Sequence, residues 1–162
     1  MSKDYIPQQT VKILQESYSE MKQIKQLSLF VENRTGALAE VCDTIRKAGF
    51  NIRTLTLADT QQFGILRLLV DDPAGAQKAL ESAGMTAKVT EVMAIGVPHR
   101  AGGLADLLAV FGKHDLAVEY MYAFAAGNNE RAVMIFRFSD QDAAMAALST
   151  EKIEILNESD LL

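Results

Sequence analysis

The sequence predicts an α+β fold made of two tandem units, each with the element order βαββαβ. Two observations predict it: a loop motif that occurs twice, 66 residues apart, and the same succession of hydrophobic patterns after each copy. The copies are NRTGALAE at 33–40 and HRAGGLAD at 99–106, which are identical at four of eight positions. This order implies antiparallel sheets with helices on one face and a core between the layers.

The first unit is expected to span residues 24–92. Its predicted elements are a strand at 26–32, a helix at 36–48, strands at 51–58 and 63–70, a helix at 73–83 and an extended segment at 87–97. Gly49 and Gly84 end the two helices, and Asp72 followed by Pro73 begins the second. Residues 1–23 lie outside the repeat and form either a docked helix or an extension.

The second unit is expected to span residues 93–162. Its predicted elements are strands at 93–97, 117–124, 131–138 and 152–156 and helices at 102–113 and 140–148. The third strands are apolar at alternate positions in both units, at Leu66/Met134, Leu68/Phe136 and Val70/Phe138. Arg67 and Arg137 lie between these positions, so one sheet face is buried and the other is mixed. No Pro- or Gly-rich linker separates the units, which predicts a fixed relative placement.

The first helix of each unit repeats one apolar pattern. Leu38, Val41, Cys42 and Ile45 correspond to Leu104, Leu107, Leu108 and Phe111, the spacing of one buried helix face. Cys42 is therefore expected to be a small buried hydrophobic residue rather than a nucleophile.

Composition excludes several classes of partner and site. The net charge of −5 leaves no basic field for nucleic acid or an anionic membrane. Cys42 is the only cysteine and the chain has two histidines, so we expect no intrachain disulfide, no metal site and no cofactor. No signal-peptide core or membrane span is apparent, and a cytoplasmic location is the expectation. No set of residues with the pattern of a catalytic triad or dyad is apparent, and the hypothesis that the protein is an enzyme is the weakest.

The repeated loop, polar-Arg-x-Gly-x-Leu-Ala-[Glu/Asp], within a ferredoxin-like βαββαβ unit resembles the ACT domain, a small-molecule-binding regulatory module. GFNI at 49–52 and FGILRLLVDDP at 63–73 are also similar to stretches usual in that family, and the resemblance covers about residues 24–160. It is closest to stand-alone proteins of two tandem ACT domains. Two departures are Thr35 and Ala101, where the family often has proline, and the second unit's lack of a Gly-x-Asn-Ile stretch.

The resemblance implies a non-catalytic regulatory protein that binds a free amino acid near the glycine loops, where two domains meet. Free backbone N–H groups at a helix start suit a carboxylate, and a loop glycine lets the ligand approach the backbone. A homodimer and a regulated enzyme are the expected partners. The candidate ligand-binding residues are Asn33, Arg34, Thr35, Gly36, Ala37, Leu38, Asn51, Ile52, His99, Arg100, Ala101, Gly102, Gly103 and Leu104.

Each candidate has a plainer interpretation, and both stay open from the sequence. Gly36 and Gly102 suit tight turns, Arg34 and Arg100 suit surface salt bridges, and Thr35 suits a helix cap. His99 suits a solvated loop, and His114 suits a helix C-terminus. Tyr120, Tyr122 and Phe124 share one strand face and suit a core, an inter-domain surface or a pocket wall. The alternative function is a structural or partner-docking homodimer that regulates an enzyme by contact without its own ligand.

Overall fold

The computed structural model describes residues 23–59, 62–124 and 131–161, so most of the predicted extension and both hairpin turns lie outside the described residues. The elements are β1 (Ile24–Glu32), α2 (Ala37–Lys47), β2 (Ile52–Asp59), β3 (Phe63–Val70), α3 (Pro73–Ser82), β4 (Ala87–Pro98), α4 (Gly103–Lys113), β5 (Val118–Phe124), β6 (Arg131–Phe138), α5 (Gln141–Thr150), β7 (Ile155–Leu156) and the 3-10 helix η1 (Glu158–Leu161). The predicted α+β fold with two βαββαβ units is confirmed.

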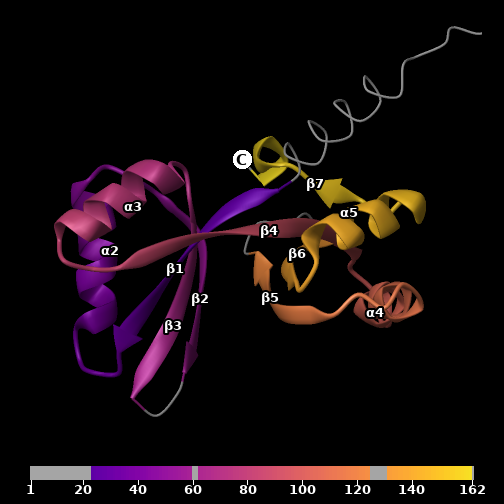
Figure 1. Ribbon diagram of the computed structural model, residues 1–162, viewed down its shortest axis with the longest axis horizontal. Coiled ribbons are helices and arrows are strands. Elements are labelled where there is room, and N and C mark those ends of the chain that lie inside the picture. The colour runs from indigo at the N-terminus through magenta and orange to yellow at the C-terminus, as the bar shows by residue number, and fades with distance from the viewer. Residues whose placement is uncertain (1–22, 60–61, 125–130, 162) are drawn as a thin grey trace, which may run out of the picture.

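Strand β4 belongs to both units. The sheet order is β2-β3-β1-β4-β6-β5, and β7 also pairs with β4. Residues 87–92 of β4 pair with β1, and residues 93–98 pair with β6. The predicted boundary between Val92 and Met93 therefore falls inside one continuous strand. Figure 1 shows β4 running from the unit that carries α2 and α3 into the unit that carries α4 and α5.

Each unit has its own core between its sheet and its helices. In the first, α2 and α3 cover Leu27, Leu66 and Leu68, all fully buried, as the alternation of β1 and β3 predicts. In the second, the rings of Phe136 and Phe138 lie against Phe111 of α4, with edge-to-face centroid distances of 5.2 and 5.0 Å. These two cores account for the apolar faces of both sheets on the helix side.

Three details differ from the predictions. Leu108 is 39% exposed and Cys42 is half-buried, so the buried stripe of α4 and α2 is narrower than the apolar pattern suggested. The last strand is only Ile155–Leu156 rather than 152–156. It begins late because α5 continues to Thr150 and Lys152 then adopts φ 55° in the turn that follows.

The helix-free faces of the two units meet in a third apolar cluster, which we call the seam. Its buried members are Ile24, Leu69, Val92, Ala94, Tyr122, Phe124, Val133, Ile135 and Leu156, with half-buried Tyr120 and Leu161 packed against them. The aromatic face of β5 is therefore inter-domain surface, one of the three interpretations open from the sequence. The two units are therefore joined both by the seam and by β4, and each of these contacts fixes the position of one unit relative to the other.

Candidate functional site

The first glycine loop, residues 33–36, begins α2 without a side-chain cap. Gly36 is the N-cap residue, with φ 90° in the left-handed region that favours glycine, and no side chain caps the helix. The predicted Thr35 cap is therefore wrong, since the left-handed turn places Gly36 rather than Thr35 at the N-cap. The glycine is required by the turn whatever else it does.

The uncapped start of α2 leaves backbone donors open. Ala37 N donates to Arg34 O at 3.3 Å, and Glu40 N donates to Gly36 O at 2.9 Å. Within the described part of the chain, the N–H groups of Leu38 and Ala39 have no acceptor.

The second helix of each unit is built differently at its start. Asp72 accepts from Gly75 N at 3.0 Å to cap α3, and Asp140 accepts from Ala143 N at 2.9 Å to cap α5. Only α2 and α4, among the four described α-helices, begin at a left-handed glycine with no side-chain cap. The difference is the same in both units, so it belongs to the repeated design.

Arg34 is engaged in ion pairs within its own loop. Its Nη1 and Nη2 groups donate to the two Glu40 carboxylate oxygens at 3.0 and 2.7 Å, and its Nε donates to Glu32 at 3.0 Å. Arg100 makes the equivalent pair with Asp106, at 2.5 Å. The surface salt-bridge interpretation thus describes both arginines, which tie each loop to the first turn of its helix.

The Arg34–Glu40 pair makes a pH-dependent contribution. Hydrogen bonds from Arg34 hold the pKa of the Glu40 carboxyl below its usual range, so the pair stabilises the fold above that range and is lost as the pH falls through the lowered pKa. We expect Arg34→Met to raise the Glu40 pKa toward the ordinary value of about 4.3, measured by carboxyl 13C NMR titration. Arg46→Met is the control, because Arg46 pairs with Asp43 instead. An unchanged Glu40 pKa in Arg34→Met would contradict this account.

The second glycine loop, residues 99–102, is tighter than the first. Gly102 has φ 82°, and a Cβ added to the next residue, Gly103, would overlap the carbonyl oxygen of Pro98. The first unit carries Ala37 at the corresponding position, buried with room for its Cβ. The two loops are therefore not interchangeable at the helix start.

We expect Gly103→Ala to destabilise the protein by about 1–3 kcal/mol, because the backbone of Pro98 must shift to admit the methyl group. Gly112→Ala in the same helix is the matched control, since its Cβ meets nothing within 4 Å. It is expected to stabilise the protein by about 0.5–1 kcal/mol. Urea unfolding measures both, and stabilisation by Gly103→Ala would show that the close approach is not there.

The structure places the predicted site residues in three separate regions. The two glycine loops follow the C-terminal ends of β1 and β4. Because these strands are antiparallel, the loops lie at opposite ends of β4. The length of β4, at about 3.3 Å per residue, separates them by roughly 40 Å. Both β1 and β2 are antiparallel to β3, which places Asn51 and Ile52 at the end of the sheet away from residues 33–36. Within one chain, neither loop lies beside Asn51.

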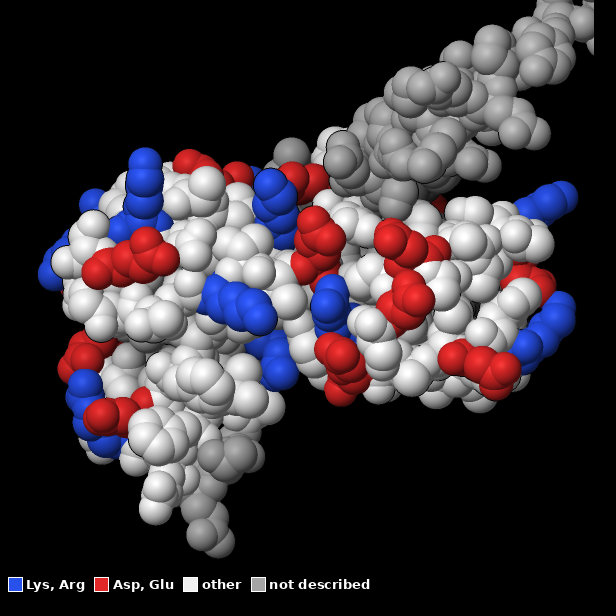
Figure 2. Space-filling model, in the orientation of Figure 1, with Lys and Arg blue, Asp and Glu red and all other residues white. Residues whose placement is uncertain are grey.

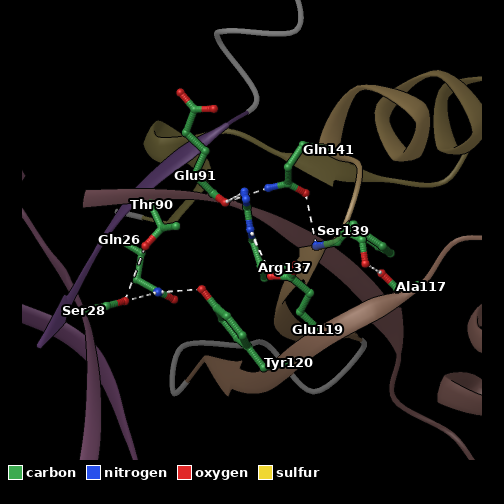
Figure 3. A network of polar contacts seen from close by, with 11 residues as sticks. Gln26, Ser28, Thr90, Glu91, Ala117, Glu119, Tyr120, Arg137, Ser139 and Gln141 are labelled. Carbon is green, nitrogen blue, oxygen red and sulfur yellow. Dashed lines mark hydrogen bonds and ion pairs between the residues drawn. The ribbon is translucent and has the colours of Figure 1, made fainter. Parts of the chain in front are cut away.

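A polar network crosses the seam, as Figure 3 shows. The Gln26 amide, fully buried, donates to Ser28 Oγ and to the Tyr120 hydroxyl, both at 2.9 Å. Its carbonyl oxygen accepts from the Tyr122 hydroxyl at 2.9 Å, and burial raises the pKa of that phenol above its usual range. The guanidinium of Arg67 stacks on the Tyr120 ring at 3.8 Å. These contacts fix how β5 lies on the first sheet.

A pocket of about 520 Å³ opens beside the seam, between the starts of β1 and β2, the end of β5 and η1. None of the predicted site residues lines it. Its Arg53 and Asp71 were missed because neither belongs to the repeated motif. The sequence did contain one signal for Arg53: its counterpart at the offset of 66 is Glu119, which has the opposite charge.

Acidic and basic side chains are interspersed on the face drawn in Figure 2. Residues 23–59, 62–124 and 131–161 contain no group of three or more His, Cys, Asp or Glu placed to hold a metal ion. No helix in these same ranges is long and apolar enough to cross a membrane.

Residues 22–162 match the family described as "ACT domain pair". The crystal structure of protein BT0572 from Bacteroides thetaiotaomicron is 37% identical and covers 86% of this chain and 96% of that chain, with a TM-score of 0.80. The regulatory subunit of aspartate kinase from Thermus thermophilus, in its ligand-free form, is 17% identical, covers 82% of this chain and 93% of its own, and shares the fold with a TM-score of 0.60.

A probable acetolactate synthase small subunit from Archaeoglobus fulgidus is 29% identical over 52% of this chain, which spans 65% of that relative's length. The match at 22–162 covers both units and the shared strand β4. The repeated loop, the βαββαβ order and this match agree, and the chain belongs to the ACT domain pair family.

Proposed function

We propose that this protein is a non-catalytic, cytoplasmic regulator that binds a free amino acid at its glycine loops. The observation that carries the proposal is the uncapped helix start behind a left-handed glycine, built twice in an ACT domain pair. Two relatives are named as a regulatory subunit and a small subunit of enzymes, which supports regulation of an enzyme by this chain as well.

The loop geometry suggests how the ligand is held. The carboxylate accepts from the open N–H groups of Leu38 and Ala39, where the helix dipole favours negative charge. Arg34, already paired with Glu40, orders the loop rather than binding the carboxylate directly. Asn33 and His99 stand at corresponding loop positions and give the two loops different selectivity for the rest of the ligand.

A second copy of the chain completes the site in this proposal. Asn51 and Ile52 lie at the far end of the sheet from residues 33–36 of the same chain. In a homodimer with the first sheets side by side and antiparallel, these residues of one protomer face the loop of its partner. Ligand binding then favours one arrangement of subunits through contacts on both.

The test is a thermal-shift screen of the wild-type protein against the free amino acids. One or a few are expected to raise Tm, since a ligand at 100 times its Kd stabilises the native state by about 2.7 kcal/mol. Gly36→Val and Gly102→Val are expected to abolish the shift at their own loops. Gly84→Val is the matched control, because Gly84 has φ 81° and, like Gly36, open space around an added Cβ.

The control separates backbone strain from ligand binding. All three variants force valine into a left-handed conformation and lower Tm by similar strain, but only the loop variants are expected to lose the ligand response. A response kept in one loop variant assigns the site to the other loop. A response kept in both, or no response of the wild type to any amino acid, contradicts the proposal.

One observation favours docking of a protein partner as a second candidate function. Strand β2 is an edge of the sheet, and its Leu55 and Leu57 are 42% and 44% exposed. If the partner at this edge is a second copy of the chain, Leu57→Lys is expected to convert the homodimer to monomers, as measured by light scattering. An unchanged mass for Leu57→Lys would exclude it.

A further inference from the structure

The second strand of each unit contains the same irregularity. In the first unit Ile52 pairs with Val70 and Thr54 with Leu69, which leaves Arg53 as an extra residue. In the second, Val118 pairs with Phe138 and Tyr120 with Arg137, which leaves Glu119 as the extra residue. A bulge of this kind redirects a side chain and is frequent beside functional sites. Arg53 and Glu119 are thus equivalent positions of the duplication.

In the second unit the bulged side chain has a partner. Glu119 pairs with Arg137 at 3.5 Å, and Arg137 also donates to the carbonyl oxygen of Glu91 at 2.8 Å, as Figure 3 shows. The residue equivalent to Arg137 in the first unit is Leu69, by its pairing with Thr54. The first unit therefore has a bulge residue of opposite charge to Glu119, and the apolar Leu69 stands where the second unit has the partner of its bulge residue.

Arg53 is left with an unused donor. Its Nε atom is buried and has no hydrogen-bond partner among the described residues. A buried donor without a protein partner loses its hydration without compensation, so such groups usually donate to an ordered water or to a ligand. The Nε–H group is thus available to an acceptor from outside the chain.

Arg53 also lines the pocket of about 520 Å³ beside the seam. Leu69, Phe124 and Leu161 supply apolar walls, and Asp71 and Glu158 supply two carboxylates. Asp71 Oδ1 is already engaged, since it accepts from Asn51 N at 3.0 Å. The volume lies in the range of small-molecule sites, about 300–1,000 Å³, and the lining combines apolar side chains with charged groups.

We propose that this pocket binds a small carboxylate with an apolar body, its carboxylate on the Arg53 guanidinium. The Nε–H and a terminal N–H of arginine form the fork that matches a carboxylate. The body of the ligand packs against Leu69 and Phe124, which belong to different units, so binding would tighten the seam. Free amino acids and simple carboxylic acids share this chemistry. The site goes beyond the proposed function because it contains no residue of either glycine loop.

The test compares three probes with one isobutyl body in isothermal titration calorimetry on the full chain. L-Leucine has both charged groups, 4-methylpentanoate only the carboxylate and 3-methylbutylamine only the ammonium; the matched phenyl series repeats the set. At least one carboxylate is expected to bind at one site per chain, and the amines are expected not to bind. Tighter binding of the amino acid identifies an amino acid as the source, with Asp71 and Glu158 facing its ammonium. Tighter binding of the simple acid identifies a carboxylic acid.

Arg53→Met is expected to weaken carboxylate binding at least about tenfold, the loss of one charged hydrogen bond. Its Tm without ligand should equal or exceed that of the wild type, because an unpaired buried donor is removed. Arg46→Met changes the net charge equally at an exposed helix position and should bind normally. If the methionine variant does not fold, Arg53→Lys replaces it in the test. Lysine keeps the positive charge but not the pair of N–H donors that matches a carboxylate, so this variant should also bind the carboxylate more weakly.

The loop variants separate this site from the proposed function. Binding that survives in Gly36→Val and Gly102→Val but falls in Arg53→Met supports the pocket. Binding that falls in a loop variant and is unchanged in Arg53→Met overturns the pocket and leaves the loop proposal standing. Absence of binding by every carboxylate in both series also overturns the pocket.

Discussion

Replacing Phe136 with alanine is expected to lower the free energy of unfolding by about 3–5 kcal/mol, the range for a large aromatic residue in a core. Phe136 is fully buried, lies edge-to-face with Phe111 and is stacked on Phe138 with centroids 5.9 Å apart. The substitution removes one of three mutually packed rings, and β6 is held between β4 and β5, so it cannot move in to close the cavity. Urea unfolding followed by circular dichroism measures the loss.

Phe30→Ala is the matched control for this substitution. Phe30 is 76% exposed on β1, so the same chemical change is expected to alter stability by no more than about 0.5 kcal/mol. A loss below about 1 kcal/mol for Phe136→Ala would mean that the three rings are not packed as described.

Replacing Gln26 with alanine is expected to cost of order 3 kcal/mol, from the cavity and from the hydroxyl groups that lose their partner. Gln26 is fully buried at the seam, where its carbonyl oxygen is the acceptor for Tyr122 and its amide is a donor to Tyr120. Tyr122 is itself only 8% exposed, so water replaces the lost acceptor poorly. Chemical denaturation measures the change.

A double-mutant cycle with Tyr122→Phe tests the origin of that loss. Removing the hydroxyl removes the group that Gln26→Ala would leave unsatisfied, so the double variant is expected to be more stable than the sum of the single losses predicts. The coupling is expected to be about 1 kcal/mol or more. Strict additivity would show that the buried hydroxyl does not depend on Gln26.

The duplication made the fold predictable from the sequence. The two loop copies and the apolar positions at Leu66/Met134, Leu68/Phe136 and Val70/Phe138 set the element order and the buried sheet face, and both are confirmed. These features depend on local periodicity, which is present separately in each unit. The extended run at 87–97 likewise predicted one strand in place of a linker, and β4 is that strand.

Features that depend on contacts between the units were not predictable. The periodicity of β5 left three interpretations for Tyr120, Tyr122 and Phe124, because an apolar strand face looks the same whatever covers it. Leu108 has the spacing of a core residue, but α4 lies so that this flank faces solvent. The assignment of ligand-binding residues stays a prediction, since it depends on partners beyond this chain.

The shared strand β4 also restricts how this gene can change in length. Side chains alternate along it, so Val92 and Ala94 face the seam while Met93 and Ile95 face the second core. Inserting one codon between Val92 and Met93 would exchange these two sets for the whole downstream half and send Met93 toward the seam. Inserting two codons would keep the alternation of side chains but would move the two units apart along β4 by one two-residue repeat of the strand. Insertions and deletions among relatives are therefore expected to avoid this strand and to collect in the hairpins and helix ends.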